Sequence, residues 1–309
     1  MFLRKFATAL LVASLISVAH AQTVSGSIVG SVQDPSGSAV PGADLKLKSV
    51  DTGVERTAKG SPTGDFAFRN IPAGEYTLSV MAQGFRRLER KGLVLSQSET
   101  LAIGISTLEV GAVTDTVTVT TQGAVVQTAS SERGSVITAS QVERIPVRGR
   151  NAWDLMQLMP GTVPAAATNE SISRNTRLNV NGGRINSLSV VVDGMGMNQI
   201  GNFANQLLNV SMDAVEEVKV LMSNYQAEYG RTSGAEVQLA TKSGKREFHG
   251  LFSYFKRHEQ FNANSFFNNR NGLAKGRYRF NTFNYNIGGP IFIPGKFNTE
   301  KNKLFFFFS

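Results

Sequence analysis

The last part of the chain, residues 246–309, alternates aromatic and polar side chains over segments of strand length. In residues 279–289, Phe283, Tyr285 and Ile287 occupy alternate positions, and asparagines lie between them. Because successive side chains of a strand point to opposite faces, this pattern predicts strands with one aromatic and one polar face. Strands of about ten residues with unequal loops are typical of a transmembrane β-barrel. A soluble amphipathic sheet is the alternative.

The same segment holds room for few strands. Further strands are expected at residues 248–254 and from residue 304 onward, with an Asn- and Gly-rich loop at residues 258–276. A barrel strand takes about 9–11 residues, so the segment contains about three. Three strands cannot close, and an open edge in lipid costs several kcal/mol for each unpaired backbone group. We therefore expect a fragment of a longer protein.

Charge and aromatic content change sharply at the start of this segment. The chain has a net charge of +9 and an isoelectric point near 9.8. Residues 245–309 contain 11 Lys or Arg against 3 Glu, and 17 of the 27 aromatic residues follow Lys245. A basic chain can attract nucleic acid, but here the positive charge belongs to the aromatic segment and the middle of the chain is near neutral. We therefore expect no nucleic-acid partner and a domain boundary at residues 245–246.

Residues 1–21 have the parts of a secretory signal peptide. Arg4 and Lys5 form its positive start, residues 6–19 its apolar stretch, and the cleavage site lies between Ala21 and Gln22. The apolar stretch is shorter than the roughly 20 residues that span a bilayer as a helix, which disfavours the alternative of an uncleaved anchor. The chain has no cysteine, which excludes disulfides and thiolate zinc sites. The sequence thus predicts an exported protein.

Residues 22–108 predict a small β-sandwich. Apolar and polar residues alternate in five short segments, separated by turn-forming Pro, Gly, Asp and Ser. The five segments are residues 27–32, 43–48, 66–68, 76–80 and 101–105. Short strands with evenly spaced turns are typical of an all-β sandwich.

The strings at residues 30–43, 64–66 and 71–76 resemble the carboxypeptidase regulatory-like domain. That resemblance implies a prealbumin-like or carbohydrate-binding-like sandwich, with spacing, docking or glycan contact as its role. Zinc-protease chemistry is not expected, because the chain has no His-Glu-x-x-His motif and only His249 and His258 follow the cleavage site.

Residues 128–245 predict a mixed α/β domain. β-Branched runs at residues 188–192, 218–221 and 237–241 are each bounded by Gly, Asn or Asp, as strands ending in tight turns are. Ser211 is expected to cap one helical turn that carries Asp213 and Glu216.

A second short helix is expected at residues 152–158, capped by Asn151 and ended by Pro160-Gly161. Trp153, Met156 and Leu158 are expected to face the core, so the single tryptophan is assigned to packing.

Four pieces follow one another in residues 179–244. A strand ends in Asp193-Gly194, the next strand begins Val-Glu216, a turn contains Tyr229-Gly230, and the exit is Thr241-Lys242-Ser-Gly244. This order resembles the plug domain of TonB-dependent outer-membrane receptors. The block at residues 145–161 resembles the plug opening in the Oar-like group of that family, with Ile145 in place of its usual Leu.

Residues 188–201 superficially resemble a dinucleotide-binding turn. The glycine spacing of such a turn requires a third glycine at residue 199, but the third glycine here is Gly201. No helix-forming run follows it. We therefore expect no nucleotide. The sequence also assigns no cofactor, no metal and no catalytic residue.

Residues 109–127 are expected to be a linker that contains a short extended run. Thr116, Val117, Thr118 and Val119 resemble a TonB box, the strand that the energising protein holds. Such a strand offers unpaired backbone groups to an incoming sheet edge. The alternative is one more strand of the sandwich.

The resemblance implies the N-terminal portion of a receptor in the outer membrane of a Gram-negative bacterium, with the sandwich in the periplasm. Its plug would gate energised uptake through the barrel, and it would not be an enzyme. Its partners would be the TonB complex of the inner membrane, outer-membrane lipid and an unidentified substrate such as a glycan, siderophore or peptide. The alternative is a secreted or surface sandwich adhesin or scaffold without transport activity.

Overall fold

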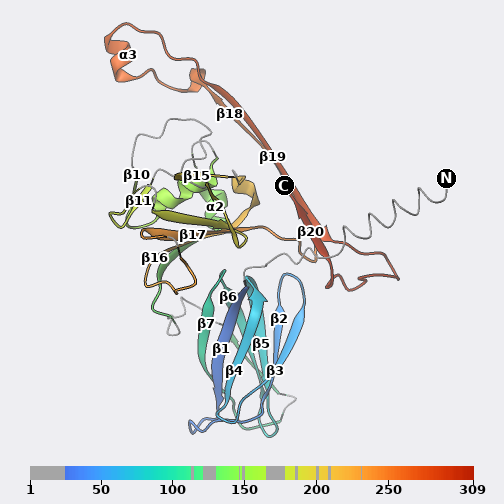
Figure 1. The fold of residues 1–309 in the computed structure, drawn as a ribbon. Coiled ribbons are helices and arrows are strands. Elements are labelled where there is room, and N and C mark those ends of the chain that lie inside the picture. Colours follow the sequence, from blue (N-terminus) through green and yellow to red (C-terminus); the bar gives the residue numbers. More distant parts are fainter. Residues whose placement is uncertain are drawn as a thin grey trace, which may run out of the picture.

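The computed structural model describes residues 25–112, 115–120, 130–145, 147, 150–164, 178–184, 187–199, 202–207, 210–230 and 232–309. These residues form a β-sandwich, a mixed five-stranded sheet with short helices, and a sheet with a long hairpin (Figure 1). The predicted signal peptide and its cleavage site, Ala21 and Gln22, lie outside the described residues.

The sandwich consists of two sheets. Its strands are β1 (Ser25–Gln33), β2 (Asp44–Ser49), β3 (Glu55–Lys59), β4 (Asp65–Pro72), β5 (Gly74–Met81), β6 (Arg87–Leu95), β7 (Thr100–Thr107) and β8 (Thr116–Thr120). One sheet has the order β4-β1-β7 and the other β3-β2-β5-β6-β8. Apolar side chains from both sheets, among them Ile28, Leu47 and Leu78, form one buried cluster between them. The five predicted strands are present.

Two strands of the sandwich were not predicted, β3 and β6. All of β3 is exposed or partly exposed, so it carries no apolar alternation. In β6 the buried residues are Leu88, Leu93 and Leu95. Leu88 and Leu93 are five positions apart, so the buried residues do not alternate regularly along the strand. A register shift against β5 lies between them, and Gly92 there has φ of +74°. An inserted residue of this kind moves the following side chains to the other face, which hides the strand pattern.

The run at residues 116–120 is a strand of the sandwich. β8 pairs in parallel with β6, in a register that joins Thr116 to Arg87 and Thr120 to Lys91. Val117 packs against the sandwich core, while the other four residues are exposed. The alternative weighed from the sequence, one more sandwich strand, is therefore what the structure shows, and contact with TonB stays a prediction.

The second body contains a five-stranded sheet. Its strands are β9 (Arg133–Thr138), β12 (Leu188–Val192), β13 (Met195–Gly196), β16 (Val215–Ser223) and β17 (Ala235–Thr241), in the order β13-β12-β17-β16-β9. β12 runs parallel to β17, and the other neighbouring pairs are antiparallel. Short ladders join β10 (Thr162–Pro164) to β11 (Leu178–Val180) and β14 (Asn198–Gln199) to β15 (Asn202–Gln206). The helix α2 (Ala139–Arg144) follows β9, and its first turn has a capping box at Thr138.

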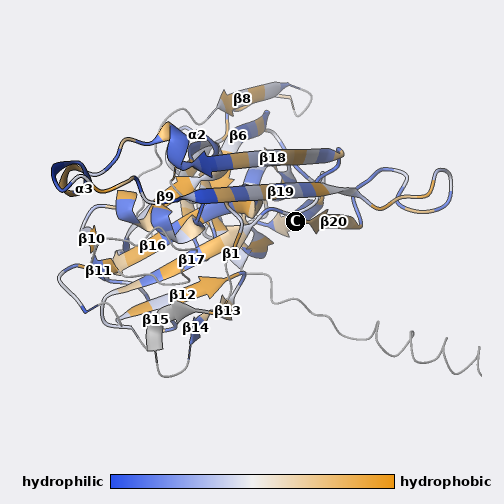
Figure 2. Ribbon diagram, turned by 90° about the horizontal axis from the view of Figure 1, so that it is seen from above, coloured by the Kyte–Doolittle hydropathy of each residue, from blue (hydrophilic) through white to orange (hydrophobic). Residues whose placement is uncertain are grey.

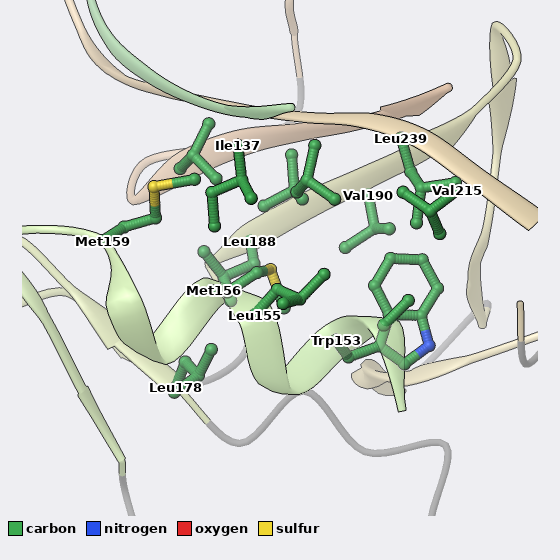
Figure 3. Packing of buried hydrophobic residues seen from close by; sticks show 14 of the residues in the cluster. Ile137, Trp153, Leu155, Met156, Met159, Leu178, Leu188, Val190, Val215 and Leu239 are labelled. Carbon is green, nitrogen blue, oxygen red and sulfur yellow. The ribbon is translucent and has the colours of Figure 1, made fainter. Parts of the chain in front are cut away.

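A 3₁₀ helix, η1 (Ala152–Leu158), packs against one face of this sheet. Trp153, Leu155 and Met156 point toward Val190 and Leu239 (Figure 3). The Asn151 side chain caps the helix by accepting a hydrogen bond from the Trp153 N–H at 3.1 Å, as predicted.

Two expectations about these helices were wrong. Leu158 is 55% exposed. Ala152 and Leu155, which share the face of Leu158 in a 3₁₀ helix, are buried, so Leu158 is exposed because it lies at the last position of η1, where the helix ends. Ser211 does cap a helical turn, η2 (Met212–Ala214), but Glu216 lies beyond it in β16.

The third body is the sheet β18 (His249–His258), β19 (Arg279–Pro290) and β20 (Phe305–Phe308), in that order. Tyr254 pairs with Phe283 and Phe252 with Tyr285, and all four side chains are exposed on one face. Figure 2 shows the resulting bands of opposite hydropathy along β18 and β19. The loop between these strands carries a 3₁₀ turn, η3 (Glu259–Phe261), and a short helix, α3 (Phe266–Arg270). The predicted alternation is therefore confirmed.

Within the described residues, no helix has the length and hydropathy needed to cross a membrane.

The two buried clusters predict two separable unfolding transitions. Leu78 belongs to the sandwich cluster and Leu155 to the cluster around Trp153, the only tryptophan, and both leucines are fully buried. Leu78→Ala and Leu155→Ala should each cost about 2–5 kcal/mol through the cavity they leave. In urea titrations of the complete chain, Leu155→Ala should lower the midpoint of Trp153 fluorescence. Leu78→Ala should lower the sandwich transition in circular dichroism and shift the Trp153 midpoint by less. An equal shift of the Trp153 midpoint by both variants would contradict this.

Candidate functional site

The predicted motif residues Asp193 and Thr241 meet at the ends of two neighbouring strands. The Asp193 carboxylate accepts hydrogen bonds from the Thr241 N–H at 2.9 Å and from the Thr241 hydroxyl at 2.7 Å. Asp193 and Gly194 both have positive φ, 47° and 83°, in the turn that leads to β13. Glycine takes that conformation without a steric penalty. This part of the motif therefore fixes the parallel pair β12 and β17 at one end.

The chain that leaves β17 is tied to its surroundings by cations. The Lys242 ammonium donates to Glu143 of α2 at 3.0 Å. Lys245 lies 3.9 Å from Glu216 and 3.3 Å from Asp51 of the sandwich. Together these contacts hold the segment after β17, residues 242–245, against both the five-stranded sheet and the sandwich.

Gly244 lies against the hairpin sheet. A Cβ there would stand 2.3 Å from the Phe306 carbonyl oxygen and 2.7 Å from its nitrogen. Only glycine allows this approach of two backbones. Gly230 is different, because nothing lies within 4 Å of a Cβ built there. The structure thus explains the glycine at position 244 but not the one at position 230.

Tyr229 lies where the turn after β16 meets the sandwich. Burial raises the pKa of its phenol, and hydrogen bonds with Ser98 of the sandwich and Gln238 of β17 act in the opposite direction. The ring also packs edge-on against Tyr225, with ring centroids 6.4 Å apart. Tyr229 thus links the sheet to the turn that joins β6 and β7.

Asp213 links the sheet body to the hairpin, although only its helical capping context was predicted. Its side chain is 6% exposed and forms an ion pair with Arg150. The Ser253 hydroxyl of β18 donates to the same carboxylate at 2.6 Å, and the Asn286 amide of β19 donates to the Asp213 carbonyl at 3.1 Å. The Arg150 guanidinium also lies 4.3 Å from the centre of the Phe255 ring. The polar face of the hairpin is therefore bonded to the sheet body, opposite its exposed aromatic face.

A second contact between bodies is centred on β16. Lys219 is 6% exposed, and its ammonium donates to the carbonyl oxygens of Gln97 at 2.9 Å and Ser98 at 3.5 Å. The Gln97 N–H in turn donates to Glu217 at 3.3 Å. Burial raises the pKa of Glu217, against the effects of its hydrogen bonds and of Lys219. No local sequence pattern predicts this contact, because Glu217 and Lys219 alternate with apolar residues as on an exposed strand face.

Other polar groups on this face of the sheet are buried as well. Glu236 is 3% exposed and Gln238 is 4% exposed, on the strand next to β16. Burial raises the pKa of Glu236, and a hydrogen bond with Ser189 acts against the rise.

An open cleft of about 780 Å³ lies where the three bodies meet, and it includes Glu143, Glu216, Lys242 and Lys245. Its lining mixes both signs of charge, so it selects neither an anion nor a cation. No group of three His, Asp or Glu side chains in the described ranges has the arrangement of a metal site.

Three family profiles match the chain in the order of these bodies. The carboxypeptidase regulatory-like domain matches residues 27–109, the TonB-dependent receptor plug domain residues 126–235, and the outer membrane beta barrel domain residues 240–309. The TonB-dependent transporter Oar of Myxococcus xanthus is 27% identical over 244 residues. Together these matches support a fragment of a TonB-dependent receptor. TonB-dependent receptors are a family of outer-membrane transporters and receptors, not of enzymes.

The aligned part covers 76% of this chain and 22% of Oar, so the chain spans about a fifth of that relative. Solved receptors of low similarity include the siderophore receptor PirA of Acinetobacter baumannii, 26% identical with a TM-score of 0.37. The match covers 51% of this chain and 22% of the PirA chain. The outer membrane transporter YddB of Escherichia coli is 16% identical with a TM-score of 0.38, over 50% of this chain and 24% of its own. The sheet with η1 is hereafter called the plug, and the sheet β18-β19-β20 the wall.

Removal of the Asp213 carboxylate should weaken the plug strongly. Asp213→Ala leaves Arg150 buried without its counter-charge, which costs about 3–5 kcal/mol when one partner of a buried pair is lost. Ser253→Ala is the matched control, since it removes a hydrogen bond from the wall side, worth about 1 kcal/mol, and leaves the ion pair intact. Urea unfolding followed by Trp153 fluorescence measures both. Equal effects of the two variants would contradict a central role for the ion pair.

The buried carboxyl of Glu236 should make plug stability depend on pH. Its pKa is raised above the ordinary 4.5, so the folded plug holds a proton that the unfolded chain has released. The free energy of unfolding should therefore fall as pH rises from about 4.5 through the raised pKa, and level off above it. Glu236→Gln should flatten this fall and stabilise the plug at neutral pH. Glu247→Gln, at an exposed position, is the control for removing one charge. An unchanged pH profile in Glu236→Gln would exclude Glu236 as its source.

Proposed function

We propose that the chain is the N-terminal portion of a receptor in which the plug gates energised uptake through an outer-membrane barrel. One observation carries this: the polar face of the hairpin is bonded to the plug through Ser253 and Asn286, and its other face exposes Phe252, Tyr254, Phe283 and Tyr285. A wall between lipid and a plug needs such a two-faced strand pair. A secreted adhesin or scaffold would not be expected to expose one sheet face covered with aromatic side chains to water.

The domain arrangement that we propose has a signal peptide at residues 1–21, cleaved between Ala21 and Gln22. A periplasmic sandwich at residues 22–108 follows, and the region at residues 109–127 adds the strand β8 to it before the chain continues to the plug. The plug covers residues 128–245, and the wall begins at residue 246. The three consecutive family matches and the compositional break near residue 245 support these boundaries.

We propose that the plug motif residues serve the plug structurally. Asp193, Gly194 and Thr241 close the strand ends, and Glu216, Lys242 and Gly244 hold the exit against its neighbours. Tyr229-Gly230 forms the turn that faces the sandwich. The substrate, whether a glycan, a siderophore or a peptide, would meet the side of the plug away from the sandwich.

The contact strand for the TonB complex would be Thr116, Val117, Thr118 and Val119. These residues form β8, the last strand of its sheet in the order found among the described residues. One edge of β8 pairs with β6, and no strand of the described residues pairs with the other, where an added strand would bind. TonB would bind there by extending the sheet and draw on the plug with energy from the inner membrane.

A proline in β8 should abolish this contact. Thr118→Pro removes a backbone N–H that faces away from β6, so capture of the receptor by the purified periplasmic part of TonB should be lost. Thr57→Pro is the matched control, because Thr57 lies in β3 at the opposite edge of the same sheet. Capture of the Thr118→Pro variant at the level of Thr57→Pro would exclude β8 as the contact.

A further inference from the structure

The sandwich is bound to the plug through a buried ammonium group. Lys219 of β16 is 6% exposed, and its ammonium donates to the carbonyl oxygens of Gln97 at 2.9 Å and Ser98 at 3.5 Å. The Gln97 N–H donates in the other direction, to the Glu217 side chain at 3.3 Å. A buried ammonium is costly unless partners satisfy it. Both of these carbonyl groups belong to the sandwich, so separation of the two bodies removes them together.

The sandwich is bound to the wall through an exposed contact. The Asp51 carboxylate lies 3.3 Å from the Lys245 ammonium, and both side chains are more than a third exposed. The Arg246 N–H donates to the Asp51 carbonyl oxygen at 3.1 Å. Gly53 belongs to the same turn, and a Cβ built there would stand 3.0 Å from a guanidinium nitrogen of Arg246. Water reaches the ion pair, so solvation competes with it.

The segment in this exposed contact is fixed to the wall. The backbone of Gly244 lies against that of Phe306 in β20. The Arg246 guanidinium donates to the Glu300 carbonyl oxygen at 3.2 Å, in the turn before β20. The ion pair of Lys245 with the plug is longer, at 3.9 Å. A plug that moves therefore leaves this segment on the wall.

The two contacts of the sandwich differ in strength for a physical reason. An exposed ion pair shifts an equilibrium by at most about fivefold, because water and salt screen its charges. A hydrogen bond to a charged group that is shielded from water shifts it by about tenfold or more. The sandwich is therefore held more firmly by the plug than by the wall.

We propose that the sandwich and the plug form one moving unit, which separates from the wall at Asp51 and keeps the contact at Lys219. This rests on the proposed function, since it takes the plug as the part that moves. The gate of the receptor is then the plug together with the sandwich. Lys219 is the positioning residue that joins them.

Hydrogen exchange of two backbone amides tests the moving unit, in the full-length receptor in lipid nanodiscs. The Gln97 N–H reports on the contact with the plug and the Arg246 N–H on the contact with the wall, because each donates across its own interface. After correction for intrinsic rates, the Gln97 amide should exchange at least about ten times more slowly than the Arg246 amide. An Arg246 amide that exchanges as slowly as that of Gln97 would overturn the proposal.

Asp51→Asn tests whether the two contacts open separately. It removes the ion pair with Lys245, so exchange of the Arg246 amide should rise by up to about fivefold while that of Gln97 stays unchanged. Asp44→Asn is the matched control, since it removes an exposed, ion-paired carboxylate elsewhere in the sandwich and should alter neither amide. Equal acceleration of both amides by Asp51→Asn would show one joint opening and would overturn the moving unit.

Lys219→Met tests the joint itself, because it keeps most of the side-chain stem and removes the ammonium. Exchange of the Gln97 amide should rise by at least about tenfold. An unchanged Gln97 amide would overturn the role of Lys219. These rates need neither TonB nor substrate, so their failure would overturn the moving unit alone, whereas TonB capture tests the proposed function separately.

Discussion

The whole arrangement depends on one buried carboxylate, that of Asp213. It lies at the point where the plug meets the wall, and it is satisfied from both sides, by Arg150 of the plug and Ser253 of β18. A buried ion pair gains stability only if good geometry and further hydrogen bonds offset its desolvation. The Ser253 hydroxyl and the cation–aromatic contact of Arg150 with Phe255 supply part of that offset from the wall. Separation of plug and wall therefore leaves the pair less well satisfied, which favours the plugged state.

The plug sheet is unusual in having a buried polar face. One face carries the apolar cluster around Trp153, and the other carries Lys219, Glu236 and Gln238, each less than a tenth exposed. Such groups persist in a folded protein because partners satisfy them. For Lys219 the partners belong to the sandwich. The sandwich is therefore part of what makes this sheet stable, rather than a domain that only shares the chain with it.

Strong local patterns made most of the fold predictable. The β-branched runs of β12, β16 and β17, the aromatic alternation of β18 and β19, and the cap at Asn151 each result from neighbours in sequence. β6 was missed because the bulge at Gly92 interrupts its alternation. The pairing of β8 and the burial of Lys219 depend on residues far away in the chain, and no local pattern distinguishes them from an exposed strand. The same holds for Asp213, whose place in the helical turn capped by Ser211 was predicted but whose contact with β18 was not.

The contacts between bodies differ in kind from the contacts within them. Within the sandwich and the plug, apolar clusters bury their side chains together, so partial opening exposes apolar area and is cooperative. Between the bodies, the contacts described above are ion pairs and hydrogen bonds centred on Asp213, Lys219 and Lys245. Directed polar bonds break over a short displacement, and water then solvates the separated groups. The bodies can therefore part from one another without either apolar core being lost, as the proposed gating by the plug requires.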